Sequence, residues 1–222
     1  HCRLLRIDLN SGQSRVIHEN NLWLGHPIYR PYHDDTVAFC HEGPHDLVDA
    51  RMWLVNEDGT NVRKVKEHAE GESCTHEFWV PDGSALIYVS YLKNQADRQI
   101  WRYDPDRNHN EVIMTMPACS HLMSNETGTL LVGDGSGTPV DVQDASGYTI
   151  ENDPWLYVFD VNKKQYARVA AHHSSWQVLD GDRQVTHPHP SFTPDDKKIL
   201  FSSDFEGKPA IYLATLPNDL FN

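Results

Sequence analysis

Short apolar runs separated by Pro, Asp and Gly turns recur along this chain. Each repeat has an apolar stretch, then a turn, then a run with alternating apolar residues, which is the pattern of a β-hairpin. The repeats lie at residues 27–39, 78–90, 122–133 and 191–203. Their turns align at Asp35, Gly83, Gly128 and Asp196. The pattern therefore predicts a series of hairpins along the chain.

A further strand pattern follows each hairpin. These strands are predicted at residues 52–56, 100–104, 155–160 and 211–214, and a similar one opens the chain at 4–8. A turn and a fourth short strand follow, and four strands per unit of about 45 residues are typical of a β-propeller. A β-sandwich with coincidental turns is the alternative, but turn and strand patterns that stay in phase along the chain argue against it. The sequence thus predicts an all-β fold of the β-propeller class.

The extent of the repeat predicts how much of a propeller is present. Residues 1–222 read as a single array of about four and a half blades that opens on the third strand of a blade. Because a propeller needs closure to remove its sheet edges, we expect a C-terminal portion that lacks N-terminal blades. Residues 133–153, rich in Gly, Asp and Ser, are expected to form a loop inserted in the repeat.

Composition narrows the possible partners. The net charge is −13 and no basic stripe offsets it, which argues against nucleic acid. No apolar run is long enough to span a bilayer, so no membrane partner is expected. An anionic ligand would need local positive charge, from Arg51 or a bound cation. The cysteines lack C-x-x-C spacing and are expected to be reduced and half-buried, as in a cytosolic protein.

Histidines recur at one position of the repeat. His76, His121 and His189 each lie seven residues before an aligned turn residue. His187 and His189 are two apart, so on a strand both face the same way, and Gln184 just before them offers an amide oxygen. Convergent imidazoles indicate a metal or a proton-transfer group, and they fit several divalent metals. A polar loop at the top of a blade is the alternative for His187 and His189.

Two other residues have open roles at this stage. His76 fits a metal ligand, a base beside the metal, or a histidine hydrogen-bonded in a channel wall. Arg51 precedes the strand predicted at residues 52–56, where an arginine is usually a surface charge.

Longer motifs resemble a known family. They are residues 175–195, with Gln184-Val-Thr-His187-Pro-His189-Pro at their centre, residues 200–207 and 209–212, His121-Leu-Met-Ser-Asn125 and Val132-Gly-Asp-Gly135. This set closely resembles the C-terminal end of oligogalacturonate lyases. The resemblance implies a seven-bladed propeller of bacterial pectin degradation that acts in the cytoplasm. It also implies β-elimination on short galacturonate oligomers with Mn²⁺, although another divalent metal would fit the same ligands.

The resemblance assigns roles to individual residues. The family's metal ligands fall on His121, Gln184, His187 and His189, its proposed base falls on His76, and a substrate-contacting arginine falls on Arg51. Three rival functions share the fold. A non-catalytic TolB-like binding module predicts no stoichiometric metal, a lactonase would recruit carboxylate ligands, and the propeller of a peptidase would need a hydrolase domain.

Overall fold

The computed structural model describes residues 1–33, 35–44, 47–92, 98–135, 153–177 and 185–221. The chain divides into two compact units, His1–Leu92 with Trp101–Glu111, and Lys93–Ile100 with Val112–Asn222. Every regular element among the described residues is a β-strand, which confirms the all-β prediction. No helix among them is long and apolar enough to cross a membrane.

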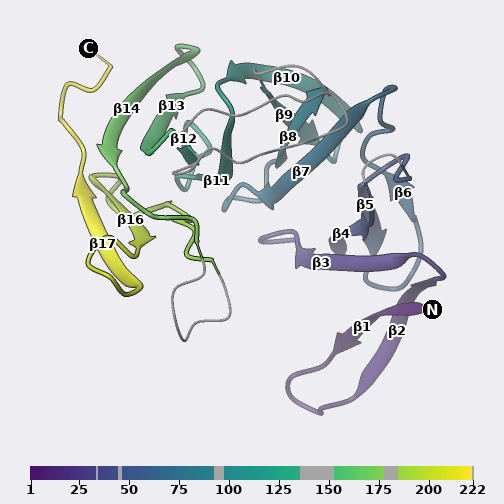
Figure 1. Ribbon diagram of the computed structural model, residues 1–222. Helices are drawn as coiled ribbons and strands as arrows, with labels where there is room; N and C mark the ends of the chain where they lie inside the picture. Colours follow the sequence, from purple (N-terminus) through teal and green to yellow (C-terminus); the bar gives the residue numbers. More distant parts are fainter. Residues whose placement is uncertain (34, 45–46, 93–97, 136–152, 178–184, 222) are drawn as a thin grey trace. The chain divides into compact units, whose positions relative to one another are not determined.

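The strands form sheets in chain order (Figure 1). A two-stranded sheet opens the chain, with β1 (Cys2–Ile7) and β2 (Ser14–Asn20). The next sheet contains β3 (Trp23–Tyr29), β4 (Thr36–Glu42), β5 (Met52–Asn56) and β6 (Arg63–Lys64). The third contains β7 (Glu72–Trp79), β8 (Leu86–Leu92), β9 (Arg98–Asp104) and β10 (His109–Met116).

The second unit continues the same pattern. One sheet contains β11 (Cys119–Ser124), β12 (Leu130–Gly135), β13 (Trp155–Asp160) and β14 (Gln165–Ala171). The last has three strands within the described residues, β15 (Ser191–Phe192), β16 (Lys198–Ser203) and β17 (Ala210–Thr215). Successive sheets of four short strands, each strand paired with its neighbour in the chain, are the blades of a β-propeller. The predicted strands 52–56 and 155–160 coincide with β5 and β13.

Apolar side chains between neighbouring sheets form the core of each unit. In the first unit, Leu54, Tyr88 and Tyr103 are fully buried in one cluster. In the second, Val132 and Val158 pack in a cluster with Ile199 of the next sheet. Each fully buried side chain of this size stabilises the fold by about 1.5–3 kcal/mol. The sheets are therefore held face to face by the apolar positions of their alternating patterns.

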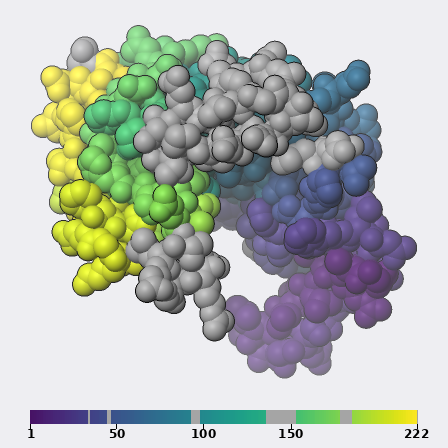
Figure 2. All heavy atoms as spheres, viewed as in Figure 1, coloured from purple at the N-terminus to yellow at the C-terminus, as the bar shows by residue number. Residues whose placement is uncertain are grey.

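The last strand shows this alternation at the surface. Tyr212 and Ala214 pack against the core of the second unit, while Ile211 and Leu213 are 70% and 50% exposed. Figure 2 shows the C-terminal residues, in yellow, on the outside of this unit. One face of β17 thus contributes to the core and the other faces solvent.

The turn between β3 and β4 differs from its predicted position. The His33 N–H donates to the Arg30 carbonyl at 3.2 Å, as Gly83 does to Val80 at 2.8 Å. Equivalent bonds place Gly128 and Asp196 in the next two hairpin turns. The alignment of Asp35 with these residues is therefore wrong, and His33 is their equivalent. Proline suits the second position of such a turn because its φ is fixed, and Pro31, Pro81 and Pro194 occupy that position.

The expected loop at residues 133–153 begins later than predicted. Gly133, Asp134 and Gly135 belong to β12, and residues 136–152 lie outside the described residues. A Cβ on Gly133 would lie 2.7 Å from Leu122 Cδ2 and 3.0 Å from Cys119 Sγ. Close packing of these strands therefore needs glycine at this position, although the sequence around Gly133 indicates a loop.

Candidate functional site

A histidine in the left-handed backbone conformation marks the start of each main sheet. The φ angles are 48°, 54°, 45° and 44° for His26, His76, His121 and His189. The strand register shifts at the first three, between Gly25 and Ile28, Thr75 and Phe78, and Ser120 and Met123. Positive φ is uncommon for a residue other than glycine, and such β-bulges often re-aim side chains near functional sites. The repeat therefore presents a histidine from the same backbone position four times.

Sequence reasoning missed His26. It lies seven residues before His33, as His76 lies seven before Gly83. The misplaced alignment of Asp35 hid this spacing. Aligning the turns on Pro31, Pro81 and Pro194 would have found it.

Imidazoles converge in the second unit. His121, His187 and His189 each offer a ring nitrogen, and these atoms all lie within 4.8 Å of one another. The ring centroid of His121 lies 3.8 Å from that of His189 and 5.1 Å from that of His187. The structure thus brings together three of the four predicted metal ligands. The fourth, Gln184, lies outside the described residues.

A buried carboxylate orients one of these imidazoles. Asp134 is fully buried, and its oxygens accept the Nδ1–H of His121 at 2.9 and 3.0 Å. Asp134 also accepts the backbone N–H of His189 at 3.1 Å. With the proton on Nδ1, the lone pair of His121 is on Nε2, which is the tautomer that a metal-ligating histidine with a carboxylate partner adopts. Sequence reasoning missed Asp134 because it assigned this stretch to a loop.

The surroundings favour neutral imidazoles. Burial, followed by the neighbouring His121, lowers the pKa of His187 and of His189. The ring of Trp176 lies 4.4 Å from that of His187 and 5.8 Å from that of His121, forming an apolar wall. Because metals bind the neutral imidazole, this donor set fits a divalent metal ion.

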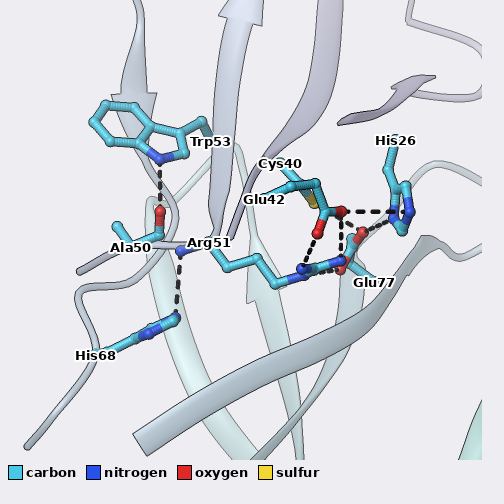
Figure 3. Close-up of polar contacts among 8 residues, drawn as sticks. All are labelled: His26, Cys40, Glu42, Ala50, Arg51, Trp53, His68 and Glu77. Atoms are coloured by element: carbon cyan, nitrogen blue, oxygen red, sulfur yellow. Dashed lines mark hydrogen bonds and ion pairs between the residues drawn. The ribbon is translucent and has the colours of Figure 1, made fainter. Parts of the chain in front are cut away.

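Arg51 has a different environment from the one predicted. Its side chain is only 12% exposed, so the expectation of a surface charge is wrong. Its Nη1 and Nη2 donate to the two oxygens of Glu42 at 2.9 and 3.0 Å, and its Nε donates to Glu77 at 3.1 Å (Figure 3). Burial is the largest single effect and would lower the pKa of Arg51, but the charge of Glu77 and the hydrogen bonds to Glu42 and Glu77 together outweigh it and raise the pKa. Arg51 is thus a fixed cation oriented by carboxylates on β4 and β7.

Glu77 is the centre of this cluster in the first unit. Its side chain is 2% exposed. One of its oxygens accepts hydrogen bonds from His26 Nδ1 at 2.6 Å and from Cys40 Sγ at 2.8 Å. Burial alone would raise the pKa of Glu77, but the hydrogen bond from His26 and the charge of Arg51 outweigh it and hold the pKa at about 2. The same hydrogen bond raises the pKa of His26. Glu77 is therefore ionised, and it favours a protonated His26.

The ligand atoms of His26, Cys40 and Glu77 also lie within 4.8 Å of one another. Bonds of about 2.0–2.3 Å to a tetrahedral metal would separate ligand atoms by roughly 3.3–3.8 Å. The separations of 2.6 and 2.8 Å from Glu77 are instead those of hydrogen bonds, and the same carboxylate already binds the Arg51 cation. This cluster is a hydrogen-bonded ion-pair network.

The cysteines are reduced, as predicted, but three of them are more buried than predicted. All four are free thiols, and Cys40, Cys74 and Cys119 are fully buried where half-buried side chains are predicted. Burial, followed by the charge of Glu77, raises the pKa of the Cys40 thiol. Cys40 therefore stays protonated and serves as a hydrogen-bond donor.

His76 precedes Glu77 in the bulge of β7. Its side chain is half-buried. His76 and Glu77 lie where the register between β7 and β8 shifts. Glu77 is thus both the chain neighbour of His76 and the ion-pair partner of Arg51.

Blades and convergent imidazoles together define a β-propeller protein with a candidate metal centre. The sequence profile of the oligogalacturonate lyase family matches residues 1–220. The chain belongs to this family.

Individual relatives agree with this assignment. An oligogalacturonide lyase of Pectobacterium atrosepticum is 67% identical over 221 residues, which are 100% of this chain and 57% of that protein. A solved oligogalacturonate lyase in complex with manganese is 66% identical, with a TM-score of 0.89 over 99% of this chain and 55% of that one. The solved oligogalacturonate lyase of Vibrio parahaemolyticus is 62% identical, with a TM-score of 0.88 over 98% of this chain and 55% of that one. The β-propeller prediction is confirmed, and the chain spans a little over half the length of these relatives.

Proposed function

We propose that this chain is part of a metal-dependent lyase that cleaves short galacturonate oligomers by β-elimination in the cytoplasm. The convergence of His121, His187 and His189 is the observation that carries the proposal. The manganese complex of a relative with 66% identity supports Mn²⁺ as the ion, held by these imidazoles together with Gln184. The family match favours the lyase over a non-catalytic TolB-like binding module.

The reaction needs two bonds to break beside a carboxylate. The C5 proton leaves, its bonding electrons form the C4=C5 double bond, and the C4–O4 electrons depart with the oxygen. A bound divalent ion supplies positive charge that stabilises negative charge on the uronate carboxylate.

His76 is suited to take the C5 proton. It lies in the bulge of β7 with a backbone φ of 54°, and its side chain is half-buried. Imidazole titrates near neutral pH, and a positioned base contributes about 10²–10⁴-fold to the rate.

Arg51 is suited to hold a substrate carboxylate. A guanidinium has five N–H groups, and the bonds to Glu42 and Glu77 use one on each nitrogen. The two N–H groups left over, one on Nη1 and one on Nη2, point to opposite sides of the guanidinium, so each can donate a single hydrogen bond to a substrate carboxylate. Because Glu42 and Glu77 fix the guanidinium, little side-chain freedom would be lost on binding.

The test uses the protein at the full length that its gene encodes. Trigalacturonate turnover would be followed by the absorbance of the unsaturated uronate, with added Mn²⁺ or with EDTA. We expect turnover with Mn²⁺ and its loss with EDTA. A folded, Mn²⁺-loaded protein that produces no unsaturated uronate would contradict the proposal.

A further inference from the structure

Elimination needs a second proton transfer, because the departing O4 must gain a proton. We propose that His26 is the general acid that protonates O4, and that Glu77 is the residue that positions it. This inference rests on the proposed lyase function and assigns a proton donor to it.

The contact between these residues has the geometry of a proton donor with a buried partner. His26 Nδ1 lies 2.6 Å from Glu77 Oε1, and Glu77 is 2% exposed while the His26 side chain is 58% exposed (Figure 3). The ionised carboxylate only accepts hydrogen bonds, so Nδ1 carries a proton and Nε2 is the exchanging nitrogen. A buried carboxylate in this position holds an imidazole in orientation and stabilises the imidazolium.

The position of His26 in the fold links it to the proposed base. His26 and His76 occupy equivalent bulges on β3 and β7, with φ of 48° and 54°. Glu77 follows His76 directly and accepts the hydrogen bond from His26. The first residue of the β7 bulge, His76, is thus the proposed base. The second residue, Glu77, holds the proposed acid.

The charges around His26 favour its protonated form. Glu77 on β7 and Glu42 on β4 face it, and both raise its pKa, whereas burial and the charge of Arg51 lower it. The hydrogen bond to Glu77 is the largest effect, so the pKa of His26 is raised. Nε2 lies 3.5 Å from Glu42 Oε1, too far for a strong hydrogen bond that would hold its proton.

The other proton-bearing groups of the cluster are poor donors to a substrate. Cys40 is fully buried and directs its S–H to Glu77. Arg51 has a raised pKa because of its carboxylate partners and does not give up a proton. His26 is therefore the member of this cluster with both the exposure and the acidity for the role.

The step balances with His76 and His26 acting together. His76 takes the C5 proton, the C5–H electron pair becomes the second bond of C4=C5, and the C4–O4 pair stays on the oxygen. The Nε2 proton of His26 transfers to O4 and yields a neutral alcohol. His76 then carries the extra proton and His26 has lost one, and solvent water restores both.

A leaving group that needs no proton tests this assignment. The substrates are trigalacturonate and a galacturonate with fluoride at C4, and the protein is the full-length, Mn²⁺-loaded enzyme. We expect His26→Ala to lower trigalacturonate turnover by about 10²–10⁴-fold and to leave fluoride release near wild type. His76→Ala should lower both rates. His109→Ala, which removes an exposed imidazole on β10, should change neither.

Two results would overturn the inference. Equal losses on both substrates would show that His26 acts in binding or folding, and an unchanged trigalacturonate rate would show that it has no role. If His26→Ala does not fold, His26→Gln gives the same comparison with smaller loss of volume. A wild-type enzyme that releases neither product would instead refute the proposed lyase function.

The pH profile gives a second readout, for Glu77. Because Glu77 raises the pKa of His26, Glu77→Gln should move the basic limb of the trigalacturonate profile to lower pH. Fluoride release, which does not need the acid, should keep its basic limb. A lower rate with an unshifted profile would show that Glu77 supports the fold without positioning the acid.

Discussion

Asp134 accepts the Nδ1 proton of His121 at 2.9 Å from a fully buried position. The bond fixes the ring orientation of His121 and the tautomer with its lone pair on Nε2. A second bond, from the His189 backbone N–H, ties another of the convergent histidines to the same carboxylate. Asp134 thus organises the candidate metal centre without being one of its predicted ligands.

Removing this charge should weaken metal binding. We expect Asp134→Asn to lower Mn²⁺ affinity by about 10–100-fold, because carboxylates behind metal-ligating histidines contribute on this scale. The measurement is titration of the metal-free protein with Mn²⁺, followed by electron paramagnetic resonance. Glu206→Gln, at an exposed carboxylate of the same unit, is the matched control. An affinity equal to that of the control would contradict the role of Asp134.

Removing the Arg51 cation should destabilise the first unit. Glu42 and Glu77 would lose their shared partner, and breaking a largely buried pair costs about 3–5 kcal/mol. We expect the free energy of unfolding of Arg51→Ala to fall by an amount on this scale, measured by urea denaturation. The double variant Arg51→Ala/Glu77→Gln should recover part of the loss, because it removes a buried charge that has lost its guanidinium partner. A double variant with fully additive losses would show that the two residues do not interact.

Glu77 should make stability depend on pH in the acid range. Its pKa is about 2 in the folded protein and 4.5 without the fold, so it stabilises the fold above pH 4.5 and loses this effect as the pH falls toward 2. The difference in unfolding free energy between wild type and Glu77→Gln should therefore shrink over that range. A difference that stays constant from pH 5 to about 2 would contradict the ion-pair network.

Gly133 should not tolerate a side chain. A Cβ there would lie 2.7 Å from Leu122 Cδ2 and 3.0 Å from Cys119 Sγ, so Gly133→Ala overpacks the contact between β11 and β12. We expect a loss of about 1–3 kcal/mol in unfolding free energy, measured by chemical denaturation. Adding Leu122→Ala should relieve part of the strain. Wild-type stability of Gly133→Ala would show that the strands adjust freely at this point.

The hairpins could be predicted because their signals are local. Alternating apolar residues and Pro/Asp/Gly turns fix strands such as β5 and β13 without reference to the rest of the fold. The turn at His33 was misplaced because nearby acidic residues resemble the turn residues of other repeats. The hydrogen bond to Arg30, which defines the turn, is visible only in the structure.

The polar partners of the site could not be predicted in the same way. The spacing of His121, His187 and His189 indicated their convergence, but nothing near Asp134 or Glu77 in the sequence shows that these carboxylates are buried. Burial depends on which strands pack against them. Arg51 was misjudged for the same reason, because its partners come from two other strands, Glu42 from the paired strand β4 and Glu77 from β7 of the next sheet.

The most direct test of the proposed chemistry is the mass of the products. Trigalacturonate would be treated with the full-length protein in the presence of Mn²⁺ or of EDTA. The product masses would then be measured by mass spectrometry. β-Elimination predicts, with Mn²⁺ alone, an unsaturated fragment that is lighter by one water than the hydrolytic fragment. Saturated fragments that have gained a water, or products that form equally in EDTA, would contradict metal-dependent elimination.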